Sequence, residues 1–301
     1  MPIFYDIITI KKYSKFGSAY SMQLDHIEYR KLKGIKEFQA CEDLQLKVWG
    51  FSERELFPAR HLLTAQQNGG LVLGAFNNLN DLVGYSYAFL GSSQGKYYLY
   101  SHMLGLLEEY KYKNIGYNLK LLQRKIALER NLNLIKWTFD PLEGVNANLN
   151  LHKLGVIITE YYVDYYGEFS GINYGLPTDR FLVEWNLNST IVLDKLNKKI
   201  EASSPLTEYC LITKISQREN GFLELIDINM NCIQKKILVE IPPSIQEIKS
   251  IDFELAMDWR IKLRNIFTDY LSKGYIVIDF CSSTSGEERK SFYLLEQVFS
   301  P

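Results

Sequence analysis

One six-residue stretch carries the clearest chemical pattern in this sequence, Lys111-Tyr112-Lys113-Asn114-Ile115-Gly116. It follows an apolar run at 97–107 and precedes a run at 117–131 in which apolar residues recur at helical spacing. A turn that enters a helix leaves backbone N–H groups without carbonyl partners, and the helix dipole adds partial positive charge there. We therefore expect the N–H groups around residues 112–117, aided by Lys111 and Lys113, to bind a diphosphate.

Strands on both sides must position this turn. The pattern predicts a strand at 97–107, a helix at 117–131, a strand at 134–139 and an Asn-rich helix that ends at Leu154-Gly155. A helical crossover between two strands implies that they are parallel. Earlier in the chain, apolar runs at 71–76 and 82–90 flank a polar turn, which predicts an antiparallel hairpin. The sheet should therefore be mixed, and parallel strands that separate at their ends would expose backbone groups between them.

Residues 101–155 resemble the acyl-CoA-binding core of the GNAT superfamily of N-acyltransferases, and the chain is similar to a prokaryotic family of predicted GNAT acyltransferases. The superfamily signature Gln/Arg-x-x-Gly-x-Gly/Ala corresponds here to Lys111-x-x-Asn114-x-Gly116. Lys keeps a donor at the first position, and Asn is among the few side chains that enter left-handed conformations readily. The context adds residues 102–110 before the turn and, after it, residues 137–143, Asn146 and Leu154-Gly155.

The resemblance implies an α/β (α+β) fold with a GNAT-like mixed, mainly antiparallel sheet flanked by helices. It also implies acyl-CoA, with acetyl or succinyl as the acyl group, as co-substrate. The pantetheine arm would pair with the strand before the turn, where a backbone N–H near 104–106 would polarise the thioester carbonyl. The residues that would contact the coenzyme are Leu104, Leu106, Lys111, Tyr112, Lys113, Asn114, Ile115, Gly116, Tyr117 and Asn146.

Acyl transfer also needs a base for the amine and an acid for the leaving thiolate. His102 and Glu143 compete as base, although a His in an apolar strand is more often structural and Glu143 could simply help to start the next helix. By the resemblance, the acid would be a Tyr at position 151, which here is Leu. His152 is adjacent, but neighbours in a helix point about 100° apart. By the same resemblance, a water chain could take the place of a single base. The thiolate could leave unaided or take its proton from a Tyr elsewhere in the chain.

Other residues carry weaker expectations. Helices are predicted at 36–49 and 60–68, and Phe51, Phe57 and Arg60 are candidates for acceptor contacts, with a structural role favoured for each. Arg60 or Arg180 could hold an acceptor carboxylate. The loop at 167–179, with Phe169 and Tyr174, could close over the acceptor or pack on the C-terminal region. Charged residues of the 117–131 helix read as a solvated face, namely Lys120, Arg124 and Lys125.

Composition bounds the class of protein. The 301 residues carry a net charge of −1 and are 47% hydrophobic, so no strong positive field is present to bind nucleic acid. The four cysteines are far apart, with no metal-ligand spacing, and no window reaches the apolar length of a membrane span. We expect a cytoplasmic protein with reduced thiols, no metal, no nucleic acid and no membrane partner.

Domain boundaries follow from changes in composition. We expect an N-terminal arm at 1–27, a GNAT-like domain at 28–187, a linker at 188–205 and a C-terminal α/β region at 206–301. That last region contains strand-like runs around a clear helix at 252–273, capped by Asp252, and it could complete the core or form a homodimer interface.

The sequence leaves two functions that use acyl-CoA, beside a third possibility, a structural protein that binds no CoA. The first is an acyl-CoA-dependent N-acyltransferase that acts on a small amine, with an amino acid among the candidates. The alternative is a non-catalytic GNAT-like module that binds or senses acyl-CoA, which the missing Tyr at 151 favours.

Overall fold

A computed structural model of the chain describes residues 26–168, 170–171, 174–198, 208–285 and 288–298. The expected N-terminal arm lies almost wholly outside these residues, as does the second part of the expected linker. The chain divides into two compact units, Met1–Leu90 with Ser101–Ile126, and Gly91–Tyr100 with Ala127–Pro301. The domain boundaries expected from composition stay a prediction.

The first unit contains the N-terminal helices and the strands that precede the turn. β1 pairs antiparallel with β2, and β2 pairs antiparallel with β3, as the hairpin signal predicted. The elements are β1 (Glu28–Lys31), α1 (Gly34–Trp49), α2 (Ala59–Gln67), β2 (Leu71–Phe76), most of β3 (Leu82–Ser93), the second half of β4 (Lys96–Leu106), η1 (Glu108–Tyr110) and most of α3 (Ile115–Glu129).

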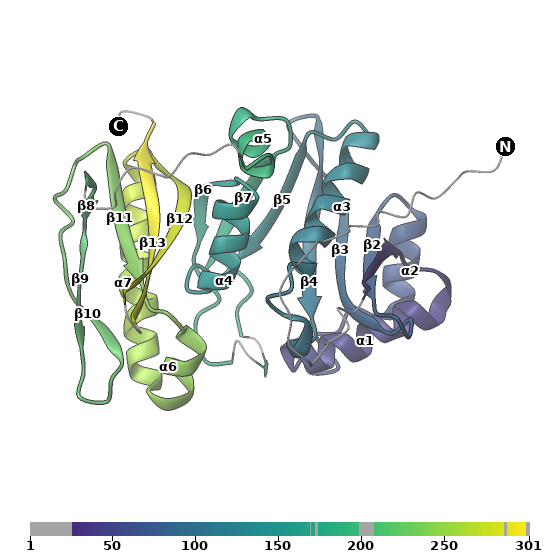
Figure 1. Cartoon of the computed structure of the whole chain (residues 1–301), viewed down its shortest axis with the longest axis horizontal. Coiled ribbons are helices and arrows are strands. Elements are labelled where there is room, and N and C mark those ends of the chain that lie inside the picture. The colour runs from purple at the N-terminus through teal and green to yellow at the C-terminus, as the bar shows by residue number, and fades with distance from the viewer. Residues whose placement is uncertain (1–25, 169, 172–173, 199–207, 286–287, 299–301) are drawn as a thin grey trace, which may run out of the picture. The chain divides into compact units, whose positions relative to one another are not determined.

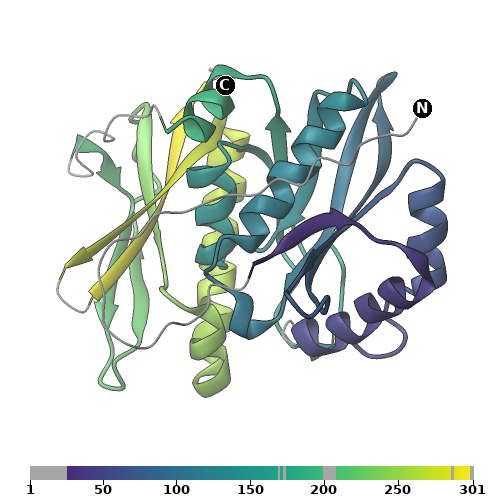
Figure 2. The same ribbon diagram turned by 45° about the vertical axis from the view of Figure 1, so that its right-hand side comes forward.

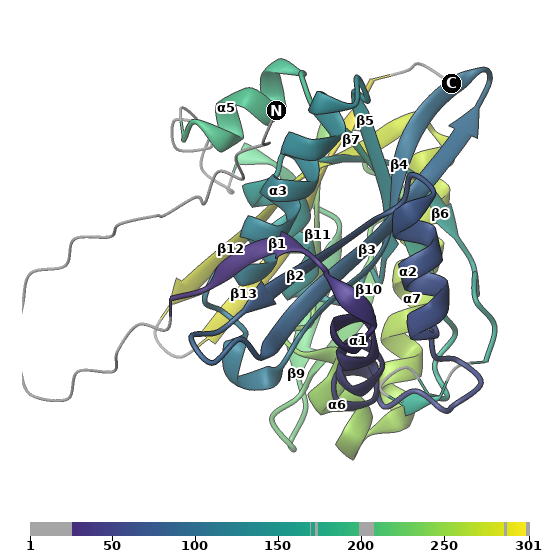
Figure 3. The same cartoon turned by 90° about the vertical axis from the view of Figure 1, so that its right-hand side faces the viewer.

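The two faces of these strands differ in chemistry. Buried apolar residues of α1 and α2, such as Phe38 and Leu62, pack against Tyr85 and Tyr87 of β3. On the opposite face α3 makes polar contacts, in which the Gln123 amide donates to Ser86 Oγ at 3.2 Å. Figure 3 shows α1 and α2 on one side of these strands and α3 on the other. The strands therefore separate an apolar layer from a polar one.

Lys120 belongs to this polar layer, and the prediction that it lies on a solvated face is wrong. Its side chain is 2% exposed, and its ammonium group donates to Ser101 Oγ at 2.8 Å. Ser101 in turn donates to Gln123 Oε1 at 3.0 Å. Burial lowers the pKa of Lys120 well below its ordinary value. Helical spacing placed Lys120 opposite the apolar stripe, but α3 buries part of that side against serines of the sheet.

Within the second unit, which includes the first half of β4, the strand order is β4-β5-β7-β6-β12-β13-β11-β8, and β9 and β10 form a separate pair. The elements are β5 (Leu134–Phe139), α4 (Gly144–Ala147), the π-helix η2 (Asn148–Lys153), β6 (Ile157–Tyr162), β7 (Arg180–Asn186), α5 (Thr190–Leu196), β8 (Cys210–Leu211), β9 (Thr213–Gln217), β10 (Leu223–Ile228), β11 (Lys236–Ile241), α6 (Ile245–Ile251), α7 (Phe253–Ser272), β12 (Tyr275–Ser285) and β13 (Glu288–Gln297).

Strand directions confirm the predicted fold class. β4 pairs parallel with β5 through Leu99 and Tyr100, opposite Ile135 and Lys136. β8 also pairs parallel with β11, whereas β7 is antiparallel to both β5 and β6. The sheet is thus mixed and mainly antiparallel, with the parallel pair at the predicted helical crossover.

The C-terminal strands extend the same sheet within the second unit. Val277 of β12 pairs with Ile158 of β6, and β12 forms a long antiparallel hairpin with β13 (Figure 2). α7 packs on β12 and β6, where Figure 1 shows it behind the strands. Asp252 caps α7 as predicted, because its carboxylate accepts from Leu255 N–H at 2.9 Å. None of the helices that the structure describes is long and apolar enough to cross a membrane.

Candidate active site

The turn before α3 has an unusual backbone. Tyr112 and Asn114 both have a φ of 61°, in the left-handed region that few side chains adopt. Asn114 stands at the second position of the sequence signature, where the superfamily pattern has Gly, and its φ explains why Asn serves there. α3 begins at Ile115, two residues before the predicted start, and Asn118 N–H donates to the Asn114 carbonyl at 3.0 Å.

Several amide groups of this turn have no backbone acceptor. Among the residues that the structure describes, the N–H groups of Tyr112 and Lys113 donate no backbone hydrogen bond, and neither do those of Ile115, Gly116 and Tyr117. Alternation of ordinary and left-handed residues turns successive N–H groups toward one side, which forms an anion-binding nest. The helix dipole of α3 adds to this, because α3 is 15 residues long. The backbone is therefore arranged to bind an anion.

Side chains of the turn add charge and leave it open. Residues 111–114 are exposed, and Tyr112 is 79% exposed. Lys111 forms an ion pair with Glu108 at 2.5 Å, and the Lys113 ammonium lies 4.8 Å from the centre of the Tyr110 ring. Both contacts are on the surface, so an incoming anion can compete for either lysine at little cost.

β4, which leads to the turn, breaks the alternation of side chains at His102. Ser101 contacts α3, whereas both His102 and Met103 contact residues on the α1–α2 side: Phe57 and Tyr85 respectively. Two consecutive residues on one face are typical of a β-bulge, a feature often found next to active sites. Further along, a Cβ at Gly105 would lie 2.6 Å from the Trp49 ring, so Gly allows α1 to approach the strand closely.

His102 lies in an aromatic cluster of the first unit. Its ring centre is 4.8 Å from that of Phe57, and Tyr87 and Phe89 are 6.2 and 6.1 Å away. His61 Nε2 is 3.2 Å from the Tyr87 hydroxyl. Burial, and to a lesser extent His61, lowers the pKa of His102, so the ring is neutral at physiological pH and able to accept a proton.

The candidates for acceptor contacts near α2 have mixed surroundings. Phe51 stacks on Trp49 at 5.4 Å, and Phe57 packs in the core cluster as well as against His102. Arg60 is exposed, and Tyr174 is 73% exposed. Phe169 lies outside the described residues.

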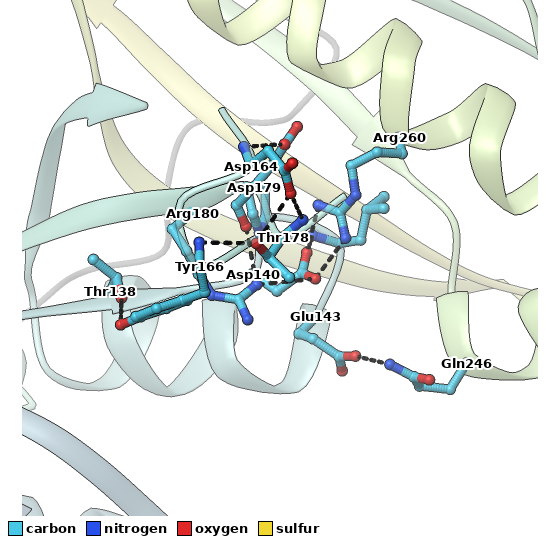
Figure 4. Close-up of polar contacts among 12 residues, drawn as sticks. Thr138, Asp140, Glu143, Asp164, Tyr166, Thr178, Asp179, Arg180, Gln246 and Arg260 are labelled. Atoms are coloured by element: carbon cyan, nitrogen blue, oxygen red, sulfur yellow. Dashed lines mark hydrogen bonds and ion pairs between the residues drawn. The ribbon is translucent and has the colours of Figure 1, made fainter. Parts of the chain in front are cut away.

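A second group of polar residues lies in the second unit, at the carboxyl end of β5 (Figure 4). Arg260 of α7 donates two hydrogen bonds to the Asp140 carboxylate, Nη1 to Oδ1 at 2.8 Å and Nη2 to Oδ2 at 2.5 Å. Arg180 Nη1 lies 3.4 Å from Oδ2. Burial alone would raise the pKa of Asp140, but Arg260 and Arg180 hold it below its ordinary value. Asp140 is therefore an ionised anchor and not a base.

Glu143 follows three residues later and has a different environment. Its Oε1 accepts a hydrogen bond from the Gln246 amide of α6 at 2.7 Å (Figure 4). Glu143 stands at the N-cap position of α4, but its side chain makes no cap hydrogen bond. Asn146, a predicted coenzyme contact, is exposed and lies inside α4.

The residues after α4 bear on the acid. Leu151, at the position where the superfamily has Tyr, is fully buried, and His152 Nδ1 lies 3.6 Å from Asp279 of β12. Other tyrosines of this unit are nearer to the end of β5, since the Tyr166 hydroxyl is 3.1 Å from Thr138 Oγ1. The phenol of Tyr166 is thus better placed than the imidazole of His152 to act as an acid at this strand end.

Sequence reasoning missed the residues that α6 and α7 contribute. Arg260 and Arg264 are four apart on α7, beside the apolar stripe, and reach two buried aspartates. The pair Arg264 and Asp179 is bidentate, with both distances 2.8 Å. The four-residue spacing of Arg260 and Arg264 beside the apolar stripe could have predicted these ion pairs. Arginines on a solvent-exposed face need not follow the stripe in this way.

Neither a scan of family models nor a search of curated proteins gave a match. Among solved structures the chain is similar to the NatC complex bound to Gag peptide and CoA, at 16% identity and a TM-score of 0.44, over 53% of this chain and 98% of that chain. The PaiA N-acetyltransferase from Thermoplasma acidophilum in complex with coenzyme A shares 23% identity at a TM-score of 0.40, over 53% and 98%.

The ribosomal-protein-S18-alanine N-acetyltransferase from Escherichia coli is also similar, at 11% identity and a TM-score of 0.43, over 55% of this chain and 96% of that chain. Each similarity thus spans about half of this chain and nearly all of the other.

Proposed function

We propose that this protein is an acyl-CoA-dependent N-acyltransferase that transfers an acetyl or succinyl group to a small amine. The observation that carries the proposal is the turn at 111–117, whose left-handed Tyr112 and Asn114 leave amide groups without backbone acceptors at the start of α3. A diphosphate fits such a backbone nest, and coenzyme A carries one. The β4–α3–β5 crossover around the turn supports the same ligand, because an extended pantetheine arm can bind beside a strand.

The reaction requires no covalent enzyme intermediate. The neutral amine attacks the thioester carbonyl, a tetrahedral intermediate forms, and the CoA thiolate leaves and takes a proton. His102 is one candidate for the base, because its lowered pKa keeps the ring neutral at physiological pH. Glu143 is the other, and the Gln246 amide that donates to its Oε1 holds the carboxylate in place.

The first experiment measures binding and turnover separately. Isothermal titration with CoA tests the turn, and thiol release from acetyl-CoA and succinyl-CoA with a panel of amines tests transfer. We expect binding in the micromolar range and release with at least one amine. Absence of CoA binding would reject the proposal.

Two variants identify the base. His102→Gln and Glu143→Gln each remove one candidate, and the loss of a general base lowers kcat by about 10²–10⁴. CoA affinity should stay unchanged in both, which separates the chemical step from coenzyme binding.

A non-catalytic acyl-CoA sensor is the second candidate, favoured by Leu151, which is buried where the superfamily acid would stand. CoA binding without thiol release for any amine would support it.

A further inference from the structure

A small cavity in the second unit has more positive than negative groups in its wall. Its volume is about 10 Å³, enough for roughly one water-sized group. Three cationic side chains line it with one carboxylate: Arg180, Lys249 and Arg260 with Asp140. Even when Glu143, bound to the lining residue Gln246, is counted, one positive charge remains. An excess buried charge is costly, so the cavity favours an anion.

The carboxylate of the wall has no capacity left for a further cation. Asp140 accepts from both Arg260 nitrogens, from Arg180 and from Leu142 N–H at 2.8 Å. Burial lowers the pKa of Lys249, while Asp140 and Glu143 oppose this shift. The Asp140 and Glu143 carboxylates therefore already have partners, and Asp140 holds the two arginines and the start of α4 in place.

Donors, in contrast, are left over. Arg260 is only 2% exposed, and its buried Nε has no hydrogen-bond partner. The described hydrogen bonds of Arg180 all come from Nη1, one to Asp140 and one to the Asp179 carbonyl at 3.0 Å. An unused N–H of a guanidinium can donate a charge-assisted hydrogen bond to an oxygen of a carboxylate.

We propose that this cavity binds a carboxylate of the acceptor, so that the acceptor is an amino acid or another amine that carries a carboxylate. This inference rests on the proposed function. The space admits one carboxylate oxygen, whereas a phosphate group is larger. The wall also continues to the end of β5, because Arg180 lies 5.4 Å from the ring of Tyr166, whose hydroxyl contacts Thr138. Glu143, a candidate base, follows Asp140 of the cavity by three residues, and Figure 4 shows both side chains.

A binding experiment tests the cavity without turnover. N-acetylglycine is the probe, and N-acetylglycinamide is its uncharged match, each titrated calorimetrically in the presence of CoA. We expect N-acetylglycine to bind about 10-fold more tightly. Equal affinities, or tighter binding of inorganic phosphate than of acetate, would overturn the proposal.

Lys249→Met should remove this preference, because it deletes a cation of the cavity that is only half-buried and so leaves the fold intact. The matched control is Lys262→Met on α7, whose ammonium group binds Asp258 at 2.7 Å and does not line the cavity. We expect a loss of about 10-fold in N-acetylglycine affinity for the first variant and no change for the second. Equal effects of the two variants would contradict the proposal.

Kinetics then separates this inference from the proposed function. With glycine and glycinamide as acceptors, Lys249→Met should raise KM for glycine only and leave kcat near wild type. Transfer with an unchanged KM ratio would reject the carboxylate site and keep the acyltransferase. Lys249-dependent binding of N-acetylglycine without any thiol release would keep the carboxylate site and reject the acyltransferase.

Discussion

The turn before α3 and the group of Asp140, Arg180 and Arg260, here called the Asp140 cluster, both gather charged or partly charged groups. They are built from different parts of the chain. The turn offers the backbone amides of five residues, namely Tyr112, Lys113, Ile115, Gly116 and Tyr117, and its side chains at 111–114 are exposed. The cluster uses side chains from β5, β7 and α7, and Arg260 lies 120 residues from Asp140 in the sequence. A backbone site depends on φ angles, whereas a side-chain site depends on tertiary packing.

This difference predicts how each site responds to substitution. The turn should tolerate any residue that accepts its backbone conformation and should fail as a ligand site before it fails as a structure. The cluster should fail as a structure first, because its groups are buried and mutually dependent. Four substitutions test this contrast, from the largest expected effect to the smallest.

Arg260→Met should have the largest effect. It leaves the Asp140 carboxylate buried with Arg180 alone, and breaking a buried pair on one side costs about 3–5 kcal/mol. Urea unfolding followed by tryptophan fluorescence measures the change in unfolding free energy. The double variant with Asp140→Asn should recover most of the loss, and Arg218→Met, at an exposed ion pair, should lose far less. Equal losses for Arg218 and Arg260 would show that the cluster is no buried anchor.

Asn114→Val should act mainly on the coenzyme. A left-handed conformation costs a residue with a Cβ branch about 1–2 kcal/mol, so the turn opens and the CoA dissociation constant should rise about 10-fold. Asn114→Gly should keep wild-type affinity. Asn131→Val is the matched control, because Asn131 has a φ of 58° just beyond the other end of α3. The comparison between turn and cluster breaks down if Asn131→Val weakens CoA binding equally.

Lys111→Glu should have a smaller effect, since the side chain is exposed and solvent screens it. We expect about 3–5-fold weaker CoA binding at low salt, and a difference that fades at high salt as the Debye length falls below about 5 Å. Lys125→Glu, on the exposed side of the same helix, is the control. Titration calorimetry at two salt concentrations gives the result, and equal affinity of wild type and variant at low salt would count against the placement of the diphosphate.

His102→Phe should have the smallest effect on stability, and that effect should depend on pH. The pKa of His102 is lower in the folded protein than in the unfolded chain, so the unfolded chain binds the proton first as pH falls below about 6.5. The contribution of neutral His102 to the free energy of unfolding is therefore fully present above that pH and is lost below it. The variant should show a flatter stability between pH 7 and 5, measured by urea unfolding. A steeper slope would mean that His102 is protonated in the folded state.

The same contrast explains how far the sequence could be interpreted. The turn was predictable because its signal is local: Asn114 needed only its tolerance for left-handed φ. β5 at 134–139 and the Asp252 cap of α7 were also predicted correctly, since a strand period and a cap are short-range patterns. α6 was missed, because its seven residues, close after Pro242-Pro243, are too few to show a helical spacing of apolar residues. The role of Arg260 could not be predicted, because its partner is set by how α7 packs on the sheet.

The burial of Lys120 has a practical consequence. An amine enclosed between a helix and two serine-bearing strands is shielded from reagents that modify surface lysines. It should become reactive only when α3 separates from the sheet, while the other lysines of that helix, such as Lys125, react at once. Timed labelling followed by mass spectrometry at this one position would therefore measure how often α3 separates from these strands, and whether added CoA slows that opening.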